Sequence, residues 1–378
     1  MSKIVKLPGL VDVHVHLREP GNIQKEDFAT GSKAAIAGGY TTIFDMPNNP
    51  NPIVDNISLE EKIDLAPGRI FCDLGFHFGG SKVSVPFFEQ VKKKVWGLKV
   101  YMNHTTGPLL IEDQNDLELI FANWPKSKII MVHAEGPTLA TAIDLAKRHG
   151  QRLHVCHLSL ASEIDQVRIA KEAGMPITAE VSAHHLFLTN EDLKRLGPFG
   201  IMKPPLSSKK DVEYIWKNLD VLDMVASDHA PHTVDEKLKS ENPPFGVPGL
   251  ETTLPLLLNA VAEKRLTLER VIELTSTNPK KVFGLSSRHF ESAFGETKNL
   301  NGSFSPLGAR AQDDNNTYIE VDLDEQWEIR NEFLYTKCGW TPFNGVKVKG
   351  RVKKVVLREV PVFNGEQIMV AVGQVIYP

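Results

Sequence analysis

Short apolar runs rich in β-forming residues recur along the chain and alternate with amphipathic segments. The runs predict strands at Leu10–Val15, Thr41–Asp45, Ile70–Phe76, Val95–Tyr101, Ile129–His133, Leu153–His157, Pro176–Glu180 and Val221–Ser227. The amphipathic segments predict helices, among them Phe28–Ala37, Asp116–Ala122, Pro137–Arg148, Ser162–Ala173 and Lys209–Asn218. Strands that alternate with helices in this way predict an α/β fold of the (β/α)8 TIM barrel type. A doubly wound sheet is disfavoured, because no Gly-x-Gly-x-x-Gly turn follows the first strand.

The pattern changes after a predicted helix at Thr267–Ser276. Residues 286–317 are rich in Ser, Gly, Asn and Asp, which is typical of a long loop or insertion. Apolar and polar residues then alternate in Tyr318–Leu323, Val346–Leu357 and Val360–Phe363, the last run before Asn364-Gly365, and predict a small β unit with a hairpin turn. We therefore expect a barrel over residues 8–285, an insertion over 286–317, and a small, mainly C-terminal β domain over 318–378 that packs with residues 1–7.

Composition and charge exclude several classes of protein. With 42% apolar and 24% charged residues, the 378-residue chain has ordinary globular usage. Its net charge of −4 gives no general attraction for nucleic acid or anionic lipid. No stretch approaches the ~18 apolar residues of a membrane span, and the N-terminus lacks a signal-peptide core. We therefore expect no nucleic-acid or membrane partner. Because three cysteines cannot form a disulfide framework in this chain, we expect a reducing, cytoplasmic location.

Polar residues cluster where the predicted strands end. In a barrel these ends converge on one face, where active sites lie, so residues distant in sequence become neighbours. The residues at these positions are His14, His16, Asp45, Asn48, Lys99, His133, His157, Glu180 and Asp228.

The segment Val13-His14-Val15-His16-Leu17 is the strongest local motif. Side chains two residues apart on a strand point the same way, so His14 and His16 can reach one metal. The alternative is two ordinary histidines on a half-buried strand. Lys99 favours the metal, because it lies in the almost wholly apolar run Val95–Met102. It either reaches solvent at the strand end or is a neutral amine that forms a carbamate with carbon dioxide, giving an anionic ligand between two metals.

His133, His157 and Asp228 close further strands and complete the predicted donor set. An N-cap role for Asp228 is the alternative, weakened by Pro231 and two nearby histidines. Imidazole and carboxylate ligands suit zinc, and two zinc ions would acidify a water molecule and polarise a carbonyl. The predicted reaction is metal-assisted hydrolysis of an amide-like bond, or its reverse, with Asp228 as the proton acceptor.

Two motifs at opposite ends of the predicted barrel make the chain resemble the dihydroorotases of the amidohydrolase superfamily. The opening motif is His14-Val15-His16-Leu17-Arg18-Glu19-Pro20-Gly21, and the closing one is Ser227-Asp228-His229-Ala230-Pro231-His232. Asp45-Met46-Pro47-Asn48, Val181–Leu186 and Gly249–Thr252 also fit. The closest likeness is to the dihydroorotase domain of the animal-type multifunctional pyrimidine proteins, from about Leu7 to Leu274 and again from Trp340 to Gly365.

The resemblance implies a role for each residue. His14, His16 and Asp228 would hold one zinc, His133 and His157 a second, and N6-carboxylated Lys99 would bridge them. Arg18, Asn48 and His232 would bind the substrate carboxylate, although a surface ion pair between Arg18 and Glu19 is the alternative. Thr105 and Thr106 would belong to a lid over the substrate, where animal members carry Thr-Phe. Lys203 would lie near the position of an arginine in the animal domain, keeping its charge but not its bidentate grip.

Cys156 and Glu180 lie beside the predicted metal ligands. Either they take a further, third zinc, or they are a buried cysteine and a carboxylate that orients a histidine. The sequence leaves both interpretations open.

The predicted activity is interconversion of N-carbamoyl-L-aspartate and L-dihydroorotate. An allantoinase or a dihydropyrimidinase shares the metal set, but Arg18 with Asn48, and His184-His185 in place of a tyrosine, favour a dihydroorotase. An inactive scaffold domain is the third interpretation, which retention of all six ligands opposes. Beyond a small-molecule substrate, we expect a homodimer and a place in a larger multienzyme polypeptide.

Overall fold

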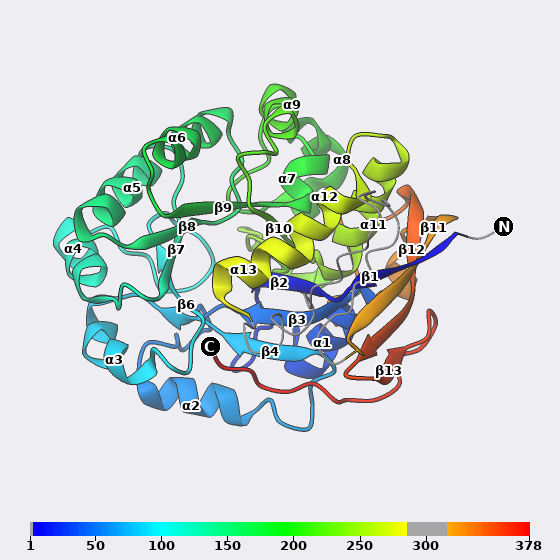
Figure 1. Cartoon of the computed structure of the whole chain (residues 1–378), viewed down its shortest axis with the longest axis horizontal. Coiled ribbons are helices and arrows are strands. Elements are labelled where there is room, and N and C mark those ends of the chain that lie inside the picture. The colour runs from blue at the N-terminus through cyan, green and yellow to red at the C-terminus, as the bar shows by residue number, and fades with distance from the viewer. Residues whose placement is uncertain (1–2, 286–315) are drawn as a thin grey trace, which may run out of the picture.

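A closed ring of parallel strands forms the centre of the computed structural model, which describes residues 3–285 and 316–378 (Figure 1). The ring runs through β2 (Leu10–Val15), β3 (Tyr40–Asp45), β4 (Asp73–Phe76), β5 (Phe78–Gly79), β6 (Gly97–Tyr101), β7 (Ile129–His133), β8 (Arg152–Val155), β9 (Ile177–Ser182) and β10 (Met224–Ala226). β4 and β5 share one position, split at His77, whose N–H donates to Asp45 O at 3.0 Å. Val15 and His229 close the ring through a parallel bridge. The predicted TIM barrel is confirmed.

Helices surround the strands on the outside (Figure 1). Asp27 and Asp55 accept hydrogen bonds from the backbone N–H groups of Thr30 and Ser58, which starts the first two helices. The helices are α1 (Phe28–Ala37), α2 (Asn56–Asp64), α3 (Phe88–Val91), α4 (Gln114–Asn123), α5 (Pro137–His149), α6 (Ala161–Glu172), α7 (Ala183–Phe187), α8 (Leu193–Leu196), α9 (Lys209–Lys217), α10 (Val234–Lys239), α11 (Leu250–Ala262), α12 (Leu268–Ile272) and α13 (Asn278–Phe283). The structure describes no helix that is long and apolar enough to cross a bilayer.

The predicted helix at Thr267–Ser276 is too short. In the structure α12 continues through a π-helical segment at Glu273–Thr277 into α13. Phe283, in the last turn of α13, reaches the barrel interior and packs against Phe44 and His154. A side chain from a helix therefore fills the base of the barrel, below the alternate inward residues of the strands.

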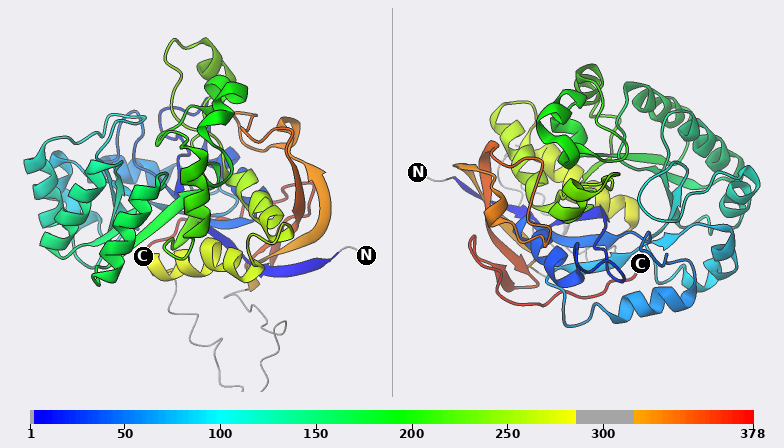
Figure 2. Two further views of the ribbon diagram at one scale, coloured as in Figure 1. Left: turned by 90° about the horizontal axis from the view of Figure 1, so that it is seen from above. Right: turned by 180° about the vertical axis from the view of Figure 1, so that it is seen from behind.

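A second, antiparallel sheet lies at one side of the barrel (Figure 2). Its order is β1 (Ile4–Pro8), β11 (Tyr318–Glu328), β12 (Lys347–Leu357) and β13 (Val360–Phe363), so the N-terminal strand pairs with a strand more than three hundred residues later. Gly350 has φ +107°, and a Cβ there would lie 2.6 Å from Leu258 Cβ of α11. Only glycine lets the two backbones approach so closely.

The β12–β13 turn was not predicted from the sequence. Arg358 and Glu359, both with positive φ, make that turn, whereas Asn364-Gly365 starts a second reversal that ends at a bridge between Phe363 and Ile368. The insertion predicted at 286–317 lies outside the described residues except for its last two.

The C-terminal tail returns to the barrel, which the sequence analysis did not predict. Val375 forms a parallel bridge with Leu74 of β4, and Trp96 Nε1 donates to Ile376 O at 3.1 Å.

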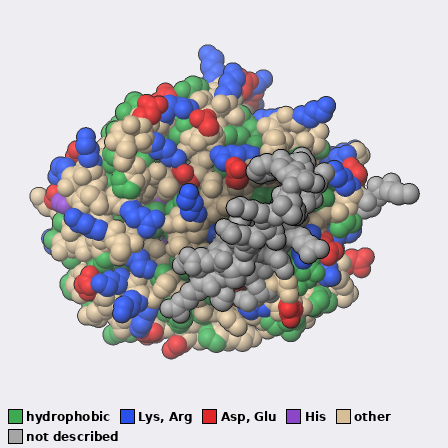
Figure 3. Space-filling view, in the orientation of Figure 1, with side chains coloured by type: hydrophobic (Ala, Val, Ile, Leu, Met, Phe, Trp, Pro, Cys, Tyr) green, Lys and Arg blue, Asp and Glu red, His purple; other side chains and the backbone are tan. Residues whose placement is uncertain are grey.

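On the molecular face shown in Figure 3, basic and acidic side chains are intermingled over the helices.

Candidate active site at the carboxyl ends of the barrel strands

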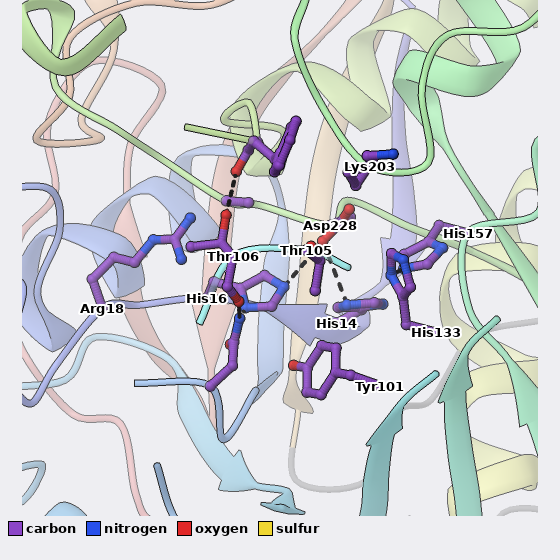
Figure 4. Close-up of a pocket in the computed structure, with 14 residues that line it drawn as sticks. His14, His16, Arg18, Tyr101, Thr105, Thr106, His133, His157, Lys203 and Asp228 are labelled. Carbon is purple, nitrogen blue, oxygen red and sulfur yellow. Dashed lines mark hydrogen bonds and ion pairs between the residues drawn. The ribbon is translucent and has the colours of Figure 1, made fainter. Parts of the chain in front are cut away.

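One cavity opens at the carboxyl ends of the strands and gathers most of the predicted site residues (Figure 4). Residues from β2, β6, β7 and the loops after β3, β8 and β10 meet there, although they are spread over more than two hundred positions. The cavity is lined by His14, His16, Arg18, Asn48, Tyr101, Thr105, Thr106, His133, His157, Lys203, Asp228, Ala230, Phe245 and Gly246. Of the residues assigned in advance to metal, substrate or lid, His232, Lys99, Cys156 and Glu180 do not line it.

His14, His16 and Asp228 form one donor cluster. Asp228 Oδ1 lies 3.4 Å from His14 Nε2 and 3.2 Å from His16 Nε2, and the three ligand atoms lie within 4.8 Å of one another. His16 Nδ1 contacts Asn48 Oδ1 at 2.7 Å, and His14 Nδ1 contacts Glu180. Because the Nδ1 atoms face oxygen acceptors, both rings present Nε2 to the cluster, as ligand histidines do. Thr233 caps α10, so Asp228 is not an N-cap.

His133 and His157 form a second pair of possible metal ligands in the same cavity. His133 Nδ1 lies 3.0 Å from His157 Nε2, so the two rings point at the same place (Figure 4). His133 Nε2 contacts Glu135 Oε1 at 3.0 Å. Glu135 was not predicted as a site residue; its contact with His133 is the kind that orients a ligand histidine.

Lys99 is fully buried beneath this cavity. Its Nζ lies 3.5 Å from His14 Nε2 and donates to Cys156 Sγ at 2.9 Å. Within the described residues no carboxylate oxygen lies within 4 Å of Nζ. The contacts of this buried amine are therefore one imidazole and one thiol.

Cys156 and Glu180 form a second donor cluster with His14, whose atoms again lie within 4.8 Å of one another. Glu180 also accepts from His157 N at 3.3 Å and contacts His154 Nε2 at 3.0 Å. His154 was not predicted, because it lies in the middle of a strand rather than at its end. Glu180 is therefore placed to orient histidines. Its cluster with His14 and Cys156 also has the donor atoms that a further metal would need.

Burial controls the protonation of these groups. It lowers the pKa values of His14, His16 and His157 well below their ordinary range, so the rings are neutral and able to bind a metal. Burial raises the pKa of Asp228 to about 7. It also raises the pKa of Tyr101 well above its ordinary value, so this hydroxyl keeps its proton at neutral pH.

Three residues of the site have the left-handed backbone that favours glycine. The φ angles are 65° at Arg18, 37° at His157 and 45° at Asp228. Such a conformation costs ~1–3 kcal/mol for a non-glycine residue and is concentrated at functional sites. The strained backbone aims three chemically active side chains into one space.

Arg18 extends along the cavity and is held by the loop after β10. Its Nε donates to Pro231 O at 3.0 Å, and Nη2 lies 3.2 Å from His232 Nε2. Glu19 pairs with Arg69 at 2.7 Å, so the alternative Arg18–Glu19 ion pair does not form. His232 is buried behind Arg18, where Lys25 Nζ lies 3.2 Å from its Nδ1 and Phe245 O accepts from Nε2 at 2.8 Å.

The loop predicted to form a lid is hydrogen-bonded to two other parts of the cavity wall. Thr106 Oγ1 donates to Phe245 O at 3.0 Å, and Asn48 Nδ2 donates to Thr106 O at 2.8 Å. Asn48 therefore contacts the lid with one amide atom and His16 with the other. Phe245 and Gly246 were not predicted, because a backbone carbonyl in a loop has no side-chain signal.

Comparison with known proteins identifies the family of this chain. The model of the amidohydrolase family matches residues 5–289. The multifunctional protein CAD of Squalus acanthias is 42% identical over 372 residues, which are 98% of this chain and 15% of that protein. The dihydroorotase of Pyrococcus furiosus is 35% identical over 379 residues, 97% of this chain and 83% of the relative.

Two solved structures share the fold. The L-hydantoinase of Arthrobacter aurescens has a TM-score of 0.86 at 24% identity, covering 100% of this chain and 89% of that one. An inactive dihydroorotase-like domain of a CAD-like multifunctional protein of Chaetomium thermophilum has a TM-score of 0.77 at 25% identity, with 99% of each chain covered. The chain spans only about 15% of its multifunctional relatives but most of the archaeal ones. By family model, sequence identity and fold, the chain belongs to the amidohydrolase family and, within it, to the dihydroorotases.

Proposed function

We propose that this chain is a zinc-dependent dihydroorotase, a hydrolase of a cyclic amide that interconverts N-carbamoyl-L-aspartate and L-dihydroorotate. The observation that carries the proposal is one cavity lined both by neutral histidines with Asp228 and by the cations Arg18 and Lys203. The first set suits a metal, and the second suits an anionic substrate. Dihydroorotate has both a hydrolysable ring amide and a carboxylate.

The donor set fits two zinc ions. His14, His16 and Asp228 would hold one, and His133 and His157 the other, with Lys99 between them. His133 Nδ1 and His157 Nε2, which lie 3.0 Å apart, would be the ligand atoms of the second ion. Zinc bound there would polarise the scissile carbonyl and acidify a water molecule.

Lys99 would bridge the two ions as N6-carboxylysine. Neutral Nζ would form a bond to the carbon of carbon dioxide and lose one proton, which leaves an anionic carbamate. This change replaces a buried group that lacks a carboxylate within 4 Å by one with two oxygen ligands. The same anion would then accept the hydrogen bond of Cys156 or pair with a metal.

Asp228 would move the proton between water and the ring nitrogen. During ring opening its carboxylate takes a proton from the attacking water and delivers it to the amide nitrogen as the C–N bond breaks. During ring closure the same carboxyl group takes the proton from the ureido nitrogen. Asp228 is placed for this role, because its Oδ1 lies in the donor cluster, 3.4 Å from His14 Nε2 and 3.2 Å from His16 Nε2.

Arg18, Asn48 and Lys203 would distinguish dihydroorotate from other cyclic amides. Dihydrouracil, hydantoin and allantoin have no ring carboxylate to pair with the Arg18 guanidinium. His232 would act through Arg18, because it lies behind that side chain instead of lining the cavity. Thr105 and Thr106 would close the lid and exclude bulk water.

A third zinc would bind at His14, Cys156 and Glu180. Glu180 already accepts three hydrogen bonds or histidine contacts, which explains its position without a metal. A zinc titration separates the two proposals: three equivalents per chain require the extra site, and two equivalents leave Glu180 as an orienting carboxylate.

The setting that we propose is a homodimeric, cytoplasmic domain of a larger multienzyme polypeptide. The similarity to 15% of the length of two multifunctional proteins supports the last point. Light scattering on the purified chain tests the dimer.

The deciding experiment is an activity panel on zinc-loaded protein with dihydroorotate, dihydrouracil, hydantoin and allantoin. We expect turnover of dihydroorotate alone and a loss of at least tenfold in kcat/KM for Arg18→Gln. Faster opening of a carboxylate-free amide would replace the proposal by a dihydropyrimidinase or allantoinase. Two bound zinc ions without any turnover would support an inactive scaffold domain instead.

A further inference from the structure

Tyr101, the last residue of β6, has a buried hydroxyl that no group of the described residues satisfies. The residue is only 3% exposed and lines the cavity, yet its Oη has no hydrogen-bond partner among the described residues. A buried hydroxyl left unpaired costs ~1–3 kcal/mol. Such a group in the wall of an active site is usually completed by the ligand or by water.

The backbone explains why this hydroxyl faces the cavity. Tyr101 and Lys99 lie two residues apart on one strand, so both side chains point into the barrel, with Tyr101 nearer the rim. The ring centroid is 5.2 Å from Lys99 Nζ and 6.2 Å from the His133 ring. Figure 4 shows the oxygen end of Tyr101 turned away from His133, toward the side of the cavity where His16 and Arg18 lie.

We propose that Tyr101 contacts the substrate, and that its hydroxyl donates a hydrogen bond to an oxygen of the carboxylated cyclic amide. The inference rests on the proposed function and adds a residue that discriminates between substrates. Arg18 supplies charge at this side of the cavity, and Tyr101 supplies a directional O–H donor that does not have to leave a protein partner. A site with such a waiting donor rejects ligands that cannot pair with it.

Tyr101→Phe separates this role from a structural one, because it removes only the oxygen. A hydroxyl with no protein partner contributes nothing to folding, so the melting temperature of the metal-free chain should stay the same or rise. Zinc content should also be unchanged. By contrast, kcat/KM for dihydroorotate and for N-carbamoyl-L-aspartate should fall at least tenfold, because the substrate oxygen is left unpaired in a dry site.

Tyr40→Phe is the matched control. Tyr40 is a fully buried tyrosine at the start of the barrel strand β3, and it packs in the apolar core without lining the cavity. Removal of the Tyr40 hydroxyl should leave kcat/KM within twofold of the wild-type value. The four-substrate panel, the zinc content and the melting temperature are measured for wild type and both variants.

The outcomes divide clearly. If wild type is active on dihydroorotate and Tyr101→Phe matches it within twofold, the inference fails while the proposed function stands. A lowered melting temperature together with lost zinc in Tyr101→Phe would also overturn it, since the hydroxyl would then be structural. If wild type opens no member of the panel, the proposed function fails and takes the inference with it.

Discussion

Lys62 should be essential for the loops that carry Arg18 and Asn48, although it lies outside the cavity. The side chain is 0% exposed, and Nζ donates to Met46 O and to Asn49 Oδ1, each at 2.8 Å. It also forms an ion pair with Asp45 Oδ2 at 2.8 Å. Asp45 Oδ1 in turn accepts from Leu17 N at 2.8 Å. One ammonium therefore ties together the segments that precede Arg18 and flank Asn48.

The size of the effect follows from burial. Lys62→Met keeps the aliphatic stem but leaves the Asp45 carboxylate, 1% exposed, without its cation. Removing one partner of a buried pair costs ~3–5 kcal/mol of unfolding free energy, because the other charge stays uncompensated. Adding Asp45→Asn removes that charge, so the double variant should recover a large part of the loss. The control is Lys94→Met, whose pair with Glu60 is about 40% exposed and should contribute less than ~1 kcal/mol.

Urea unfolding of the three variants and the single Asp45→Asn gives the coupling energy directly. Steady-state kinetics should show a raised KM for dihydroorotate in Lys62→Met, because the network holds the backbone beside Arg18 and Asn48. A loss below ~1 kcal/mol, or no recovery in the double variant, would refute the assignment of Lys62 as a buried cation that holds the two loops.

Four shorter predictions address the reaction itself. Lys99→Ala should lose most zinc and nearly all turnover, measured by elemental analysis and rate; two retained zinc ions with normal turnover would contradict the carbamate. Asp228→Asn should lower kcat by ~10²–10⁴ while substrate binding stays measurable by calorimetry, and an unchanged kcat would reassign Asp228 to binding. Thr106→Val removes the hydrogen bond to Phe245 and should slow both directions; equal rates would remove the lid from the mechanism. Ring opening releases one proton, so synthesis should be favoured at acidic pH and hydrolysis at alkaline pH. The rates in both directions are measured from pH 5.5 to 9. Rates that rise and fall in parallel would contradict Asp228 as the proton carrier of both directions.

Much of the barrel could be predicted because parallel strands buried on both faces appear as continuous apolar runs. The limits of β2, β7 and α1 match the predicted ones, whereas β4 begins at Asp73, three residues after the predicted start at Ile70. The continuation of α12 into α13 could not be read from the sequence. Its cause is tertiary: Phe283 fills the base of the barrel, which no local pattern within that helix encodes.

Residues at strand ends were found in the sequence because the barrel brings those ends together. Lys62 and His154 were missed, since each lies within an element and acts through a partner from another part of the chain. Phe245 was missed for a different reason, because the lid contacts its backbone carbonyl. Sequence patterns identify side chains with their own chemistry, and they carry little information about groups that only hold others in place.

The backbone at His157 and Asp228 explains why each of these residues was ambiguous alone. Local preference would put glycine at a positive φ, so the presence of a histidine and an aspartate there means that chemistry outweighs local stability. Hydrogen bonds from distant elements hold the strained segments: Glu180 of β9 accepts from His157 N at 3.3 Å, and His16 N donates to His229 O at 2.8 Å. The donor geometry therefore exists only after the barrel closes. A single histidine or aspartate in the sequence could belong to any fold, whereas the same residues placed at successive strand ends can meet only in this one.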